Sequence, residues 1–153
     1  MNFLSYSLTA LISFLGLITG MIVMYMAKEE QKPGGKYFIL LQKIILLLIV
    51  ISMLYFLKLD LIIFIIILSI IIISYIKKYK NKELIESCYI YPILGLIFYL
   101  SSKNKSLIII ESSLIFLYGI TTGSLLMKKS ANMKNILINT SFIFVAILFY
   151  TIL

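Results

Sequence analysis

Apolar runs separated by short lysine-containing breaks set the pattern of the chain. The runs occupy positions 3–27, 37–57, 60–76, 87–102, 107–127 and 136–153. A transmembrane helix needs about 20 mainly apolar residues to cross roughly 30 Å of hydrocarbon. The pattern therefore predicts an all-α integral membrane protein, a polytopic bundle of about six transmembrane helices that forms one domain over residues 1–153.

The composition supports helices in lipid. Hydrophobic residues make up 62% of the chain and charged residues 13%, and a soluble domain of this size could not cover its surface with so few polar groups. A membrane β-barrel would need apolar and polar residues to alternate, but positions 62–73 are an almost unbroken run of Ile, Leu and Phe. The lipid bilayer is therefore the expected surroundings of the protein.

The distribution of lysine predicts the orientation of the helices. The loops at 28–36, 77–86 and 128–135 hold ten lysines, whereas the breaks at 58–60 and 103–105 hold three. An excess of positive charge marks cytoplasmic loops. We therefore expect a multi-pass cell-membrane protein with these three lysine-rich loops in the cytoplasm and both termini outside.

The break at 28–36 carries the strongest turn signal in the chain, Pro33-Gly34-Gly35. Proline cannot continue a helix, and glycine frees the backbone for a tight reversal. The second helix is therefore expected to begin at about position 37.

The fourth apolar segment, 87–102, is the least regular. As a helix it would reach only about 24 Å, and it contains Pro92 and Gly95. A thin or tilted span and a re-entrant segment both fit these features. A re-entrant segment would place loop 128–135 outside and reduce the lysine bias to nine against four, so we expect a span.

Segments 9–20 and 112–123 resemble each other. In an ungapped alignment, Leu11, Ile12, Gly16, Thr19, Gly20 and Met24 match Leu114, Ile115, Gly119, Thr122, Gly123 and Met127. Each segment leads into a lysine-rich loop and a further span, so the pattern predicts a parallel repeat of a helical hairpin, helices 1–2 and helices 5–6. Chance agreement between two Leu- and Ile-rich helices is the alternative.

The repeated glycines have a physical role that does not depend on ancestry. Gly16 and Gly20 share one face of the first helix, and Gly119 and Gly123 share one face of the fifth. Small residues let helix backbones approach closely in lipid. These glycines are expected to pack helices within the bundle; a homodimer seam or a substrate path are the alternatives.

Glu111 is the main candidate for an intramembrane functional residue, because ionisable groups within a span are costly and tend to serve function. Tyr118 and Thr122 share its helix face at i+7 and i+11. Together they predict a polar track from which a proton or cation could be exchanged. In the alternative interpretation, the carboxylate reaches the lipid headgroups beside Lys103 or Lys105.

Other polar groups within the spans have simpler interpretations. Lys43 lies about six residues inside the second span. As an ionisable group there it is a candidate functional residue; in the alternative interpretation, its long stem snorkels to the interface. Asn139, Thr140 and Ser141 are expected to hydrogen-bond neighbouring helices. Tyrosines near span ends, among them Tyr91 and Tyr99, predict an aromatic belt at the interfaces.

Several classes of chemistry are disfavoured. The chain has no histidine and a single cysteine, Cys88, which excludes an internal disulfide, thiolate or histidine metal sites, and Ser-His or Cys-His catalysis. No cofactor, metal or catalytic residue is predicted, and the chain is not expected to be an enzyme. The lysines that give the net charge of +8 lie mostly between the spans. There they set the topology and meet anionic lipid headgroups, and they form no basic face for nucleic acid.

Two functions remain. The first is a non-enzymatic accessory or assembly subunit of a membrane complex, which would pack against other membrane subunits or against itself. The second is a small proton- or cation-coupled transporter or channel component that uses Glu111. The sequence favours the first slightly, because its polar groups gather at the two membrane faces, whereas a transporter would require several of them at mid-membrane.

Overall fold

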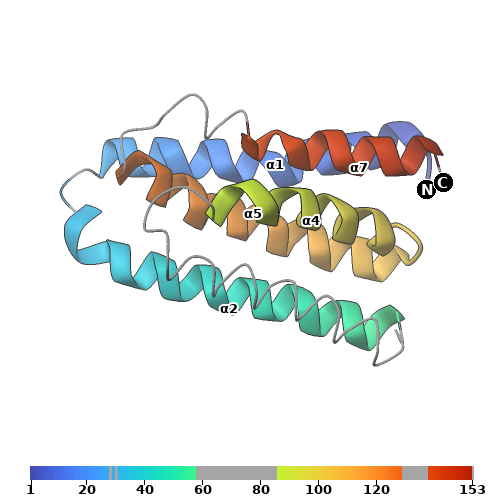
Figure 1. The fold of residues 1–153 in the computed structure, drawn as a ribbon, viewed down its shortest axis with the longest axis horizontal. Coiled ribbons are helices and arrows are strands. Elements are labelled where there is room, and N and C mark those ends of the chain that lie inside the picture. The colour runs from blue at the N-terminus through green and yellow to red at the C-terminus, as the bar shows by residue number, and fades with distance from the viewer. Residues whose placement is uncertain (28, 30, 58–85, 129–137, 153) are drawn as a thin grey trace.

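The structure, a computed structural model, describes residues 1–27, 29, 31–57, 86–128 and 138–152. Five helices lie in these ranges (Figure 1): α1 (Phe3–Met26), α2 (Gln31–Leu57), α4 (Glu86–Ser101), α5 (Lys105–Lys128) and α7 (Ser141–Ile152). This part of the chain contains no strand, and the prediction of an all-helical protein is confirmed for it. The third predicted span, 60–76, and the loops at 77–85 and 129–135 lie outside the described residues.

Three helices are long and apolar enough to cross a membrane. Their spanning portions are Phe3–Met26, Gly34–Phe56 and Lys105–Leu126. They agree with three of the predicted spans and support a membrane location. Two shorter apolar helical stretches, Ile90–Ser101 and Ser141–Ile152, pack beside them.

The predicted start of the second helix is wrong. The helix begins at Gln31 and passes through Pro33, Gly34 and Gly35. In the first turn of a helix the backbone N–H groups have no partner within the helix, so a proline there removes no hydrogen bond and its fixed φ suits the helix. The turn signal therefore marks the first turn of α2 rather than a loop.

The last predicted span, 136–153, is also not one continuous helix over its described residues. Ile138 and Asn139 are helical, Thr140 forms a turn, and α7 follows from Ser141. The backbone N–H of Ile143 donates to the Thr140 carbonyl oxygen at 3.0 Å.

The start of α5 is capped by a side chain: Asn104 accepts a hydrogen bond from the Ser106 N–H at 3.0 Å.

The contacts between helices fix their relative directions. Gly16 and Gly20 of α1 meet Phe116 and Ile120 of α5, so α1 and α5 are parallel. Contacts of Gln42 with Thr122 and of Ser52 with Glu111 make α2 antiparallel to α5. Helices α4 and α7 are parallel to each other, with Gly95 against Phe142 and Tyr99 against Phe149. The two termini lie at the same end of the bundle (Figure 1).

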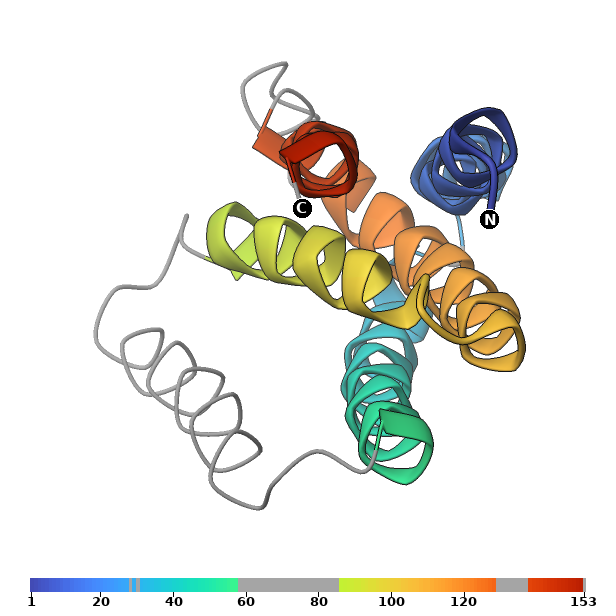
Figure 2. The ribbon, with the colours of Figure 1, turned by 90° about the vertical axis from the view of Figure 1, so that its right-hand side faces the viewer.

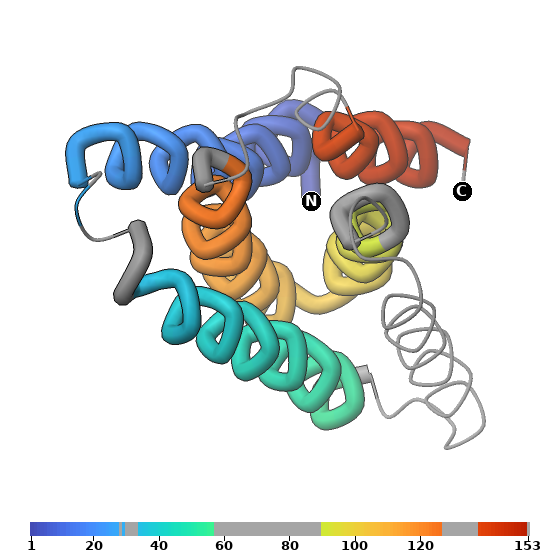
Figure 3. Tube along the Cα trace, turned by 60° about the vertical axis from the view of Figure 1, so that its left-hand side comes forward, coloured from blue at the N-terminus to red at the C-terminus, as the bar shows by residue number. Residues whose placement is uncertain are grey.

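Helix α5 lies at the centre of the described bundle. It contacts α1, α2 and α4, and it runs between α1 and α2 in Figure 3 and beside α4 in Figure 2. Half of the residues in the apolar 18-residue stretch of α5 are buried, against 17% in the corresponding stretch of α2. The residues of α5 that face its neighbours are therefore placed where a site inside the membrane would form.

Candidate functional site

The four predicted glycines lie where α1 and α5 come together, and we call them the glycine seam. A Cβ atom on Gly16 would collide with the Phe116 carbonyl oxygen, and one on Gly20 with the Ile120 carbonyl oxygen. From the other helix, a Cβ on Gly119 would lie 2.7 Å from the Leu17 nitrogen, and one on Gly123 would collide with the Leu17 carbonyl oxygen. The two backbones therefore touch directly, and no larger residue fits at these positions without separating them.

One hydrogen bond crosses the seam. The Ser124 hydroxyl donates to the Gly20 carbonyl oxygen at 3.2 Å and lies 2.9 Å from the Ile120 carbonyl oxygen of its own helix. Because the glycine faces pack within the chain, they are not left available for another subunit. The seam also holds α5 rigidly against α1, so that the opposite side of α5 faces α2 and α4.

On that opposite side, Glu111 is fully buried, with none of its side chain exposed. Its Oε1 atom lies 2.5 Å from the hydroxyl of Ser52 on α2. Its Oε2 atom is buried and has no hydrogen-bond partner among the described residues. The interpretation that this carboxyl reaches the headgroups beside Lys103 or Lys105 is therefore wrong: both lysines are exposed, and Glu111 points into the bundle.

The contact between Glu111 and Ser52 bears on whether the Glu111 carboxyl carries a proton. The Ser52 hydroxyl also lies 2.9 Å from the Ile49 carbonyl oxygen one turn back on α2. A hydroxyl carries one hydrogen, so it cannot fully serve two acceptors. A proton on Glu111 Oε1 would donate to Ser52 Oγ and leave the Ser52 hydrogen for Ile49, so that both contacts would be hydrogen bonds. We call Glu111 and Ser52 the carboxyl site.

A second polar group lies further along the same two helices. The Gln42 side-chain nitrogen donates to the Tyr118 hydroxyl at 3.2 Å and to the Thr122 hydroxyl at 3.0 Å. Tyr118 and Thr122 are almost fully buried. Thr122 in turn donates to the Tyr118 carbonyl oxygen at 2.9 Å. We call Gln42, Tyr118 and Thr122 the hydroxyl site.

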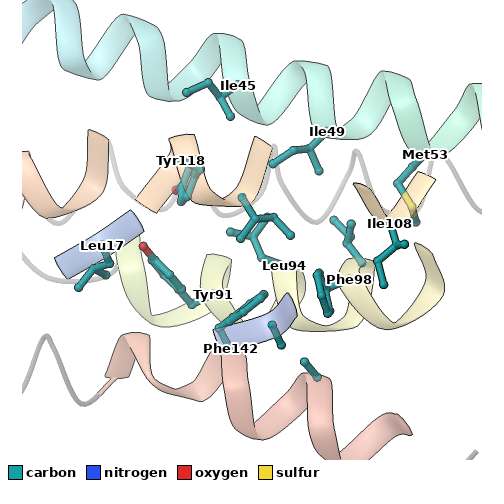
Figure 4. Close-up of a cluster of buried hydrophobic side chains, with 14 of the residues drawn as sticks. Leu17, Ile45, Ile49, Met53, Tyr91, Leu94, Phe98, Ile108, Tyr118 and Phe142 are labelled. Atoms are coloured by element: carbon teal, nitrogen blue, oxygen red, sulfur yellow. The ribbon is translucent and has the colours of Figure 1, made fainter. Parts of the chain in front are cut away.

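Isoleucines separate the two sites. On α2, Ile45 and Ile49 fall between Gln42 and Ser52 at helical spacing, and on α5 Ile115 falls between Glu111 and Tyr118. All three belong to the buried core, with exposed fractions of 4% or less. Figure 4 shows Ile45 and Ile49 pointing from α2 toward the other helices. These three side chains form what we call the isoleucine layer.

Helix α4 covers the isoleucine layer and the hydroxyl site. Leu94 is fully buried in the same core, and the Tyr91 ring packs edge-on against the Tyr118 ring, with centroids 6.0 Å apart. The Tyr91 hydroxyl is buried and has no hydrogen-bond partner among the described residues. The prediction that Tyr91 belongs to an interfacial belt is therefore wrong, because its side chain lies inside the bundle.

The last polar cluster behaves differently from its prediction. Asn139 is fully buried, and neither its amide nitrogen nor its oxygen has a hydrogen-bond partner among the described residues. The Ser141 hydroxyl is likewise unpartnered there. Among the described residues, the expected hydrogen bonds from Asn139 and Ser141 to neighbouring helices are not formed. A turn at Thr140 separates the two residues.

The structure brings together only part of the predicted set. Glu111, Tyr118 and Thr122 line one side of α5 and face α2, whereas the Lys43 side chain is exposed on α2. The α2 partners, Ser52 and Gln42, were missed by sequence reasoning. A signal existed: Gln42 and Ser52 are the polar residues of an otherwise apolar helix face that also carries Ile45 and Ile49.

The arrangement provides hydroxyl groups, an amide and one carboxyl group. Glu111, Tyr118 and Thr122 are buried in the bundle, and Gln42 and Ser52 are partly buried. No group of three or more acidic, cysteine or histidine side chains that could hold a metal ion exists among the described residues. Comparison of the chain with protein families, with curated protein sequences and with solved structures finds no match.

Proposed function

We propose that this protein is a small proton- or cation-transporting membrane protein, or the transporting component of a larger assembly, and that Glu111 is its ion-binding group. The observation that carries the proposal is a fully buried carboxyl with one oxygen on Ser52 and the other unpartnered among the described residues. An ionisable group enclosed in a membrane bundle costs free energy that ordinary helix packing does not require. The hydroxyl site adds the convergence of polar groups that the sequence pattern alone did not suggest.

The proposal includes the six-span topology with both termini outside the cell. Its support comes from the helix directions. Helix α4 is antiparallel to α5, because a short turn joins Ser101 to Lys105 and Tyr91 lies against Tyr118 further along both helices. Helix α2 is also antiparallel to α5, so α2 and α4 run the same way, and Leu57 and Glu86 lie at opposite ends of the bundle. The proposed third span at 60–76 would join these two ends.

The proposal also includes descent from a duplicated hairpin. The ungapped alignment pairs Leu17 with Ile120 and Gly20 with Gly123. In the glycine seam, the contact of Gly20 with Ile120 has its counterpart in the contact of Gly123 with Leu17. Such exchanged contacts are what a two-fold relation between parallel repeats produces, with its axis along the membrane normal.

Transport is tested with purified protein in liposomes. Cation-sensitive dyes inside the vesicles would report the entry of protons, Na⁺ or K⁺ for wild type, for Glu111→Gln and for Glu29→Gln. Glutamine keeps the size and much of the hydrogen bonding of Glu111 but cannot ionise. We expect flux in wild type and in Glu29→Gln, whose carboxyl is exposed beyond α1, and loss of flux in Glu111→Gln.

The accessory-subunit alternative makes a different prediction. A protein that only supports an assembly would co-purify with partners in mild detergent and would keep its cellular role in the Glu111→Gln variant. Equal flux, or no flux, from wild type and Glu111→Gln would end the transport proposal and leave the accessory function. The Glu29→Gln control separates an effect of Glu111 from a general effect of lost negative charge.

A further inference from the structure

We propose that the transported ion is the proton, and that the isoleucine layer is the barrier between its two binding regions, the carboxyl site and the hydroxyl site. This inference rests on the proposed transport function and narrows it. It assigns a substrate class to Glu111, a barrier role to Ile49 and Ile115, and a proton-relay role to Tyr118.

The donor set of the carboxyl site selects the proton. A dehydrated metal cation needs several oxygen ligands; Ca²⁺ takes roughly 6–8 and Mg²⁺ an octahedron of six. The described residues around Glu111 offer its own two oxygens and the Ser52 hydroxyl, while the Ile49 carbonyl oxygen is already within hydrogen-bond distance of that hydroxyl. A proton needs only one oxygen atom, and it resolves the competition for the single Ser52 hydrogen.

The hydroxyl site suits a proton and not a metal cation. It contains no carboxyl, and its polar atoms are the amide of Gln42 and the hydroxyls of Tyr118 and Thr122. A hydroxyl can accept one hydrogen while it donates another, so these groups can pass a proton along without holding a charge permanently. The unpartnered Tyr91 hydroxyl lies beside them and extends the relay onto α4.

The isoleucine layer interrupts the relay between the two sites. Glu111 and Tyr118 are seven residues apart on α5, or about 10 Å along the helix axis, which is too far for a direct transfer. The buried side chains of Ile45, Ile49 and Ile115 occupy the face between them. Apolar constrictions of this kind block water and ions until they are wetted. Proton movement therefore requires water to enter between α2 and α5.

The transfer itself is a simple proton exchange. A hydronium ion on one side gives up a proton: one of its O–H bonds breaks as an O–H bond forms on Glu111, a water molecule is left, and the charge on the carboxylate is neutralised. When the barrier is wetted, that O–H bond breaks toward water, and the proton leaves through the hydroxyl site. No group is oxidised or reduced, and the only co-reactant is water.

Few other titratable groups face the carboxyl site. The titratable groups on the described elements around it include the buried Tyr118 and Tyr91 beyond the isoleucine layer, the exposed Tyr55 one turn from Ser52 on α2, and the exposed Lys103 and Lys105 at the turn between α4 and α5. Lys43 is exposed on α2, level with the hydroxyl site. Any protonation signal from a buried carboxyl in this region is therefore assigned to Glu111.

The ion is identified by infrared spectroscopy of the reconstituted protein. A protonated carboxyl has its own C=O band, which should titrate with pH in wild type, be absent in Glu111→Gln, and be insensitive to Na⁺ and K⁺. Liposome flux measured in parallel should show Glu111-dependent entry of protons alone. Displacement of the band by Na⁺ or K⁺, with Glu111-dependent flux of that cation, would overturn the proton assignment while leaving the transport proposal intact. Absence of any Glu111-dependent flux would instead remove the transport proposal.

The barrier and the relay are tested by substitutions that leave Glu111 in place. Ile49→Ala and Ile115→Ala should raise passive proton leak, because they shorten the apolar layer. Leu126→Ala is the matched control: it removes a buried side chain from α5 beyond the hydroxyl site and should not raise leak. Tyr118→Phe should reduce proton flux while the carboxyl band of Glu111 still titrates. Unchanged leak in both isoleucine variants, or leak equal to that of Leu126→Ala, would overturn the barrier role.

Discussion

The Ser52 hydroxyl and Glu111 Oε1 lie 2.5 Å apart and join α2 to α5. Further along the same pair of helices, Gln42 donates to Thr122 at 3.0 Å. Helix α2 is thus held to α5 by polar contacts at two levels, with apolar side chains between them. In lipid, interhelical hydrogen bonds of this kind average about 0.6 kcal/mol, so the two contacts position the helices more than they stabilise them.

Replacing Ser52 by alanine tests the carboxyl site without touching its charge. The change removes the one described partner of Glu111 and should reduce transport, because the carboxyl is then no longer oriented toward α2. The unfolding free energy should fall by only about 0.5–1.5 kcal/mol. Ser113→Ala is the matched control: Ser113 is exposed on α5 and bonds within its own helix. Equal transport by the two variants would show that Ser52 does not orient Glu111.

Enlarging a glycine of the seam should destabilise the bundle. Gly20→Ala and Gly123→Ala would drive a Cβ into the backbone of the opposite helix, and the helices can separate only by losing packing along their length. We expect a loss of about 1–3 kcal/mol, as in other overpacked cores, seen as a lower melting temperature in detergent.

The control for the seam is another glycine. At Gly34, the described contact of a Cβ would be with the flexible ring of Phe38, at 3.3 Å, so Gly34→Ala should be tolerated and could stabilise α2 through helix propensity. Similar melting temperatures for all three alanine variants would contradict close glycine packing between α1 and α5.

The sequence predicted the helices better than their ends. Apolar length placed α1 and α5 to within two residues, because a span must match the thickness of the hydrocarbon. The start of α2 was placed too late, since Pro33 was read as a helix terminator, yet it occupies the first turn. The break at Thr140 was not foreseen, because no proline or glycine marks it.

The site was predicted from one helix only. Spacing along α5 put Glu111, Tyr118 and Thr122 on one face, and the structure places all three against α2. Helical periodicity does not say which neighbour that face meets. Ser52 contacts Glu111 and Gln42 contacts Thr122, and the members of each pair are more than fifty residues apart in the sequence. Contacts of this kind are defined by the fold alone. The position of Glu111 along its span could be predicted from the sequence, but its burial against α2 could not.

The proposed topology is tested by labelling single cysteines in intact cells, in a background with Cys88→Ala. Glu29 lies beyond α1 and Lys103 lies in the turn before α5, and both are exposed. With both termini outside, Lys103→Cys should react with an impermeant thiol reagent, and Glu29→Cys should react only after the membrane is permeabilised. The opposite pattern would invert the orientation, and labelling of both in intact cells would refute the span through α1 or the α2–α4 topology.

Replacing Asn139 by leucine should stabilise the protein. Asn139 is fully buried, and its amide nitrogen and oxygen are both unpartnered among the described residues. A buried polar group without a hydrogen bond costs about 1–3 kcal/mol, and leucine has nearly the same shape as asparagine without polar atoms. The melting temperature of Asn139→Leu in detergent should therefore rise. Ser141→Ala, which removes another unpartnered polar atom, should act in the same direction but less strongly. A fall in melting temperature for Asn139→Leu would mean that the amide is bonded in the native membrane, and a loss of proton flux with unchanged stability would place Asn139 in the transport path.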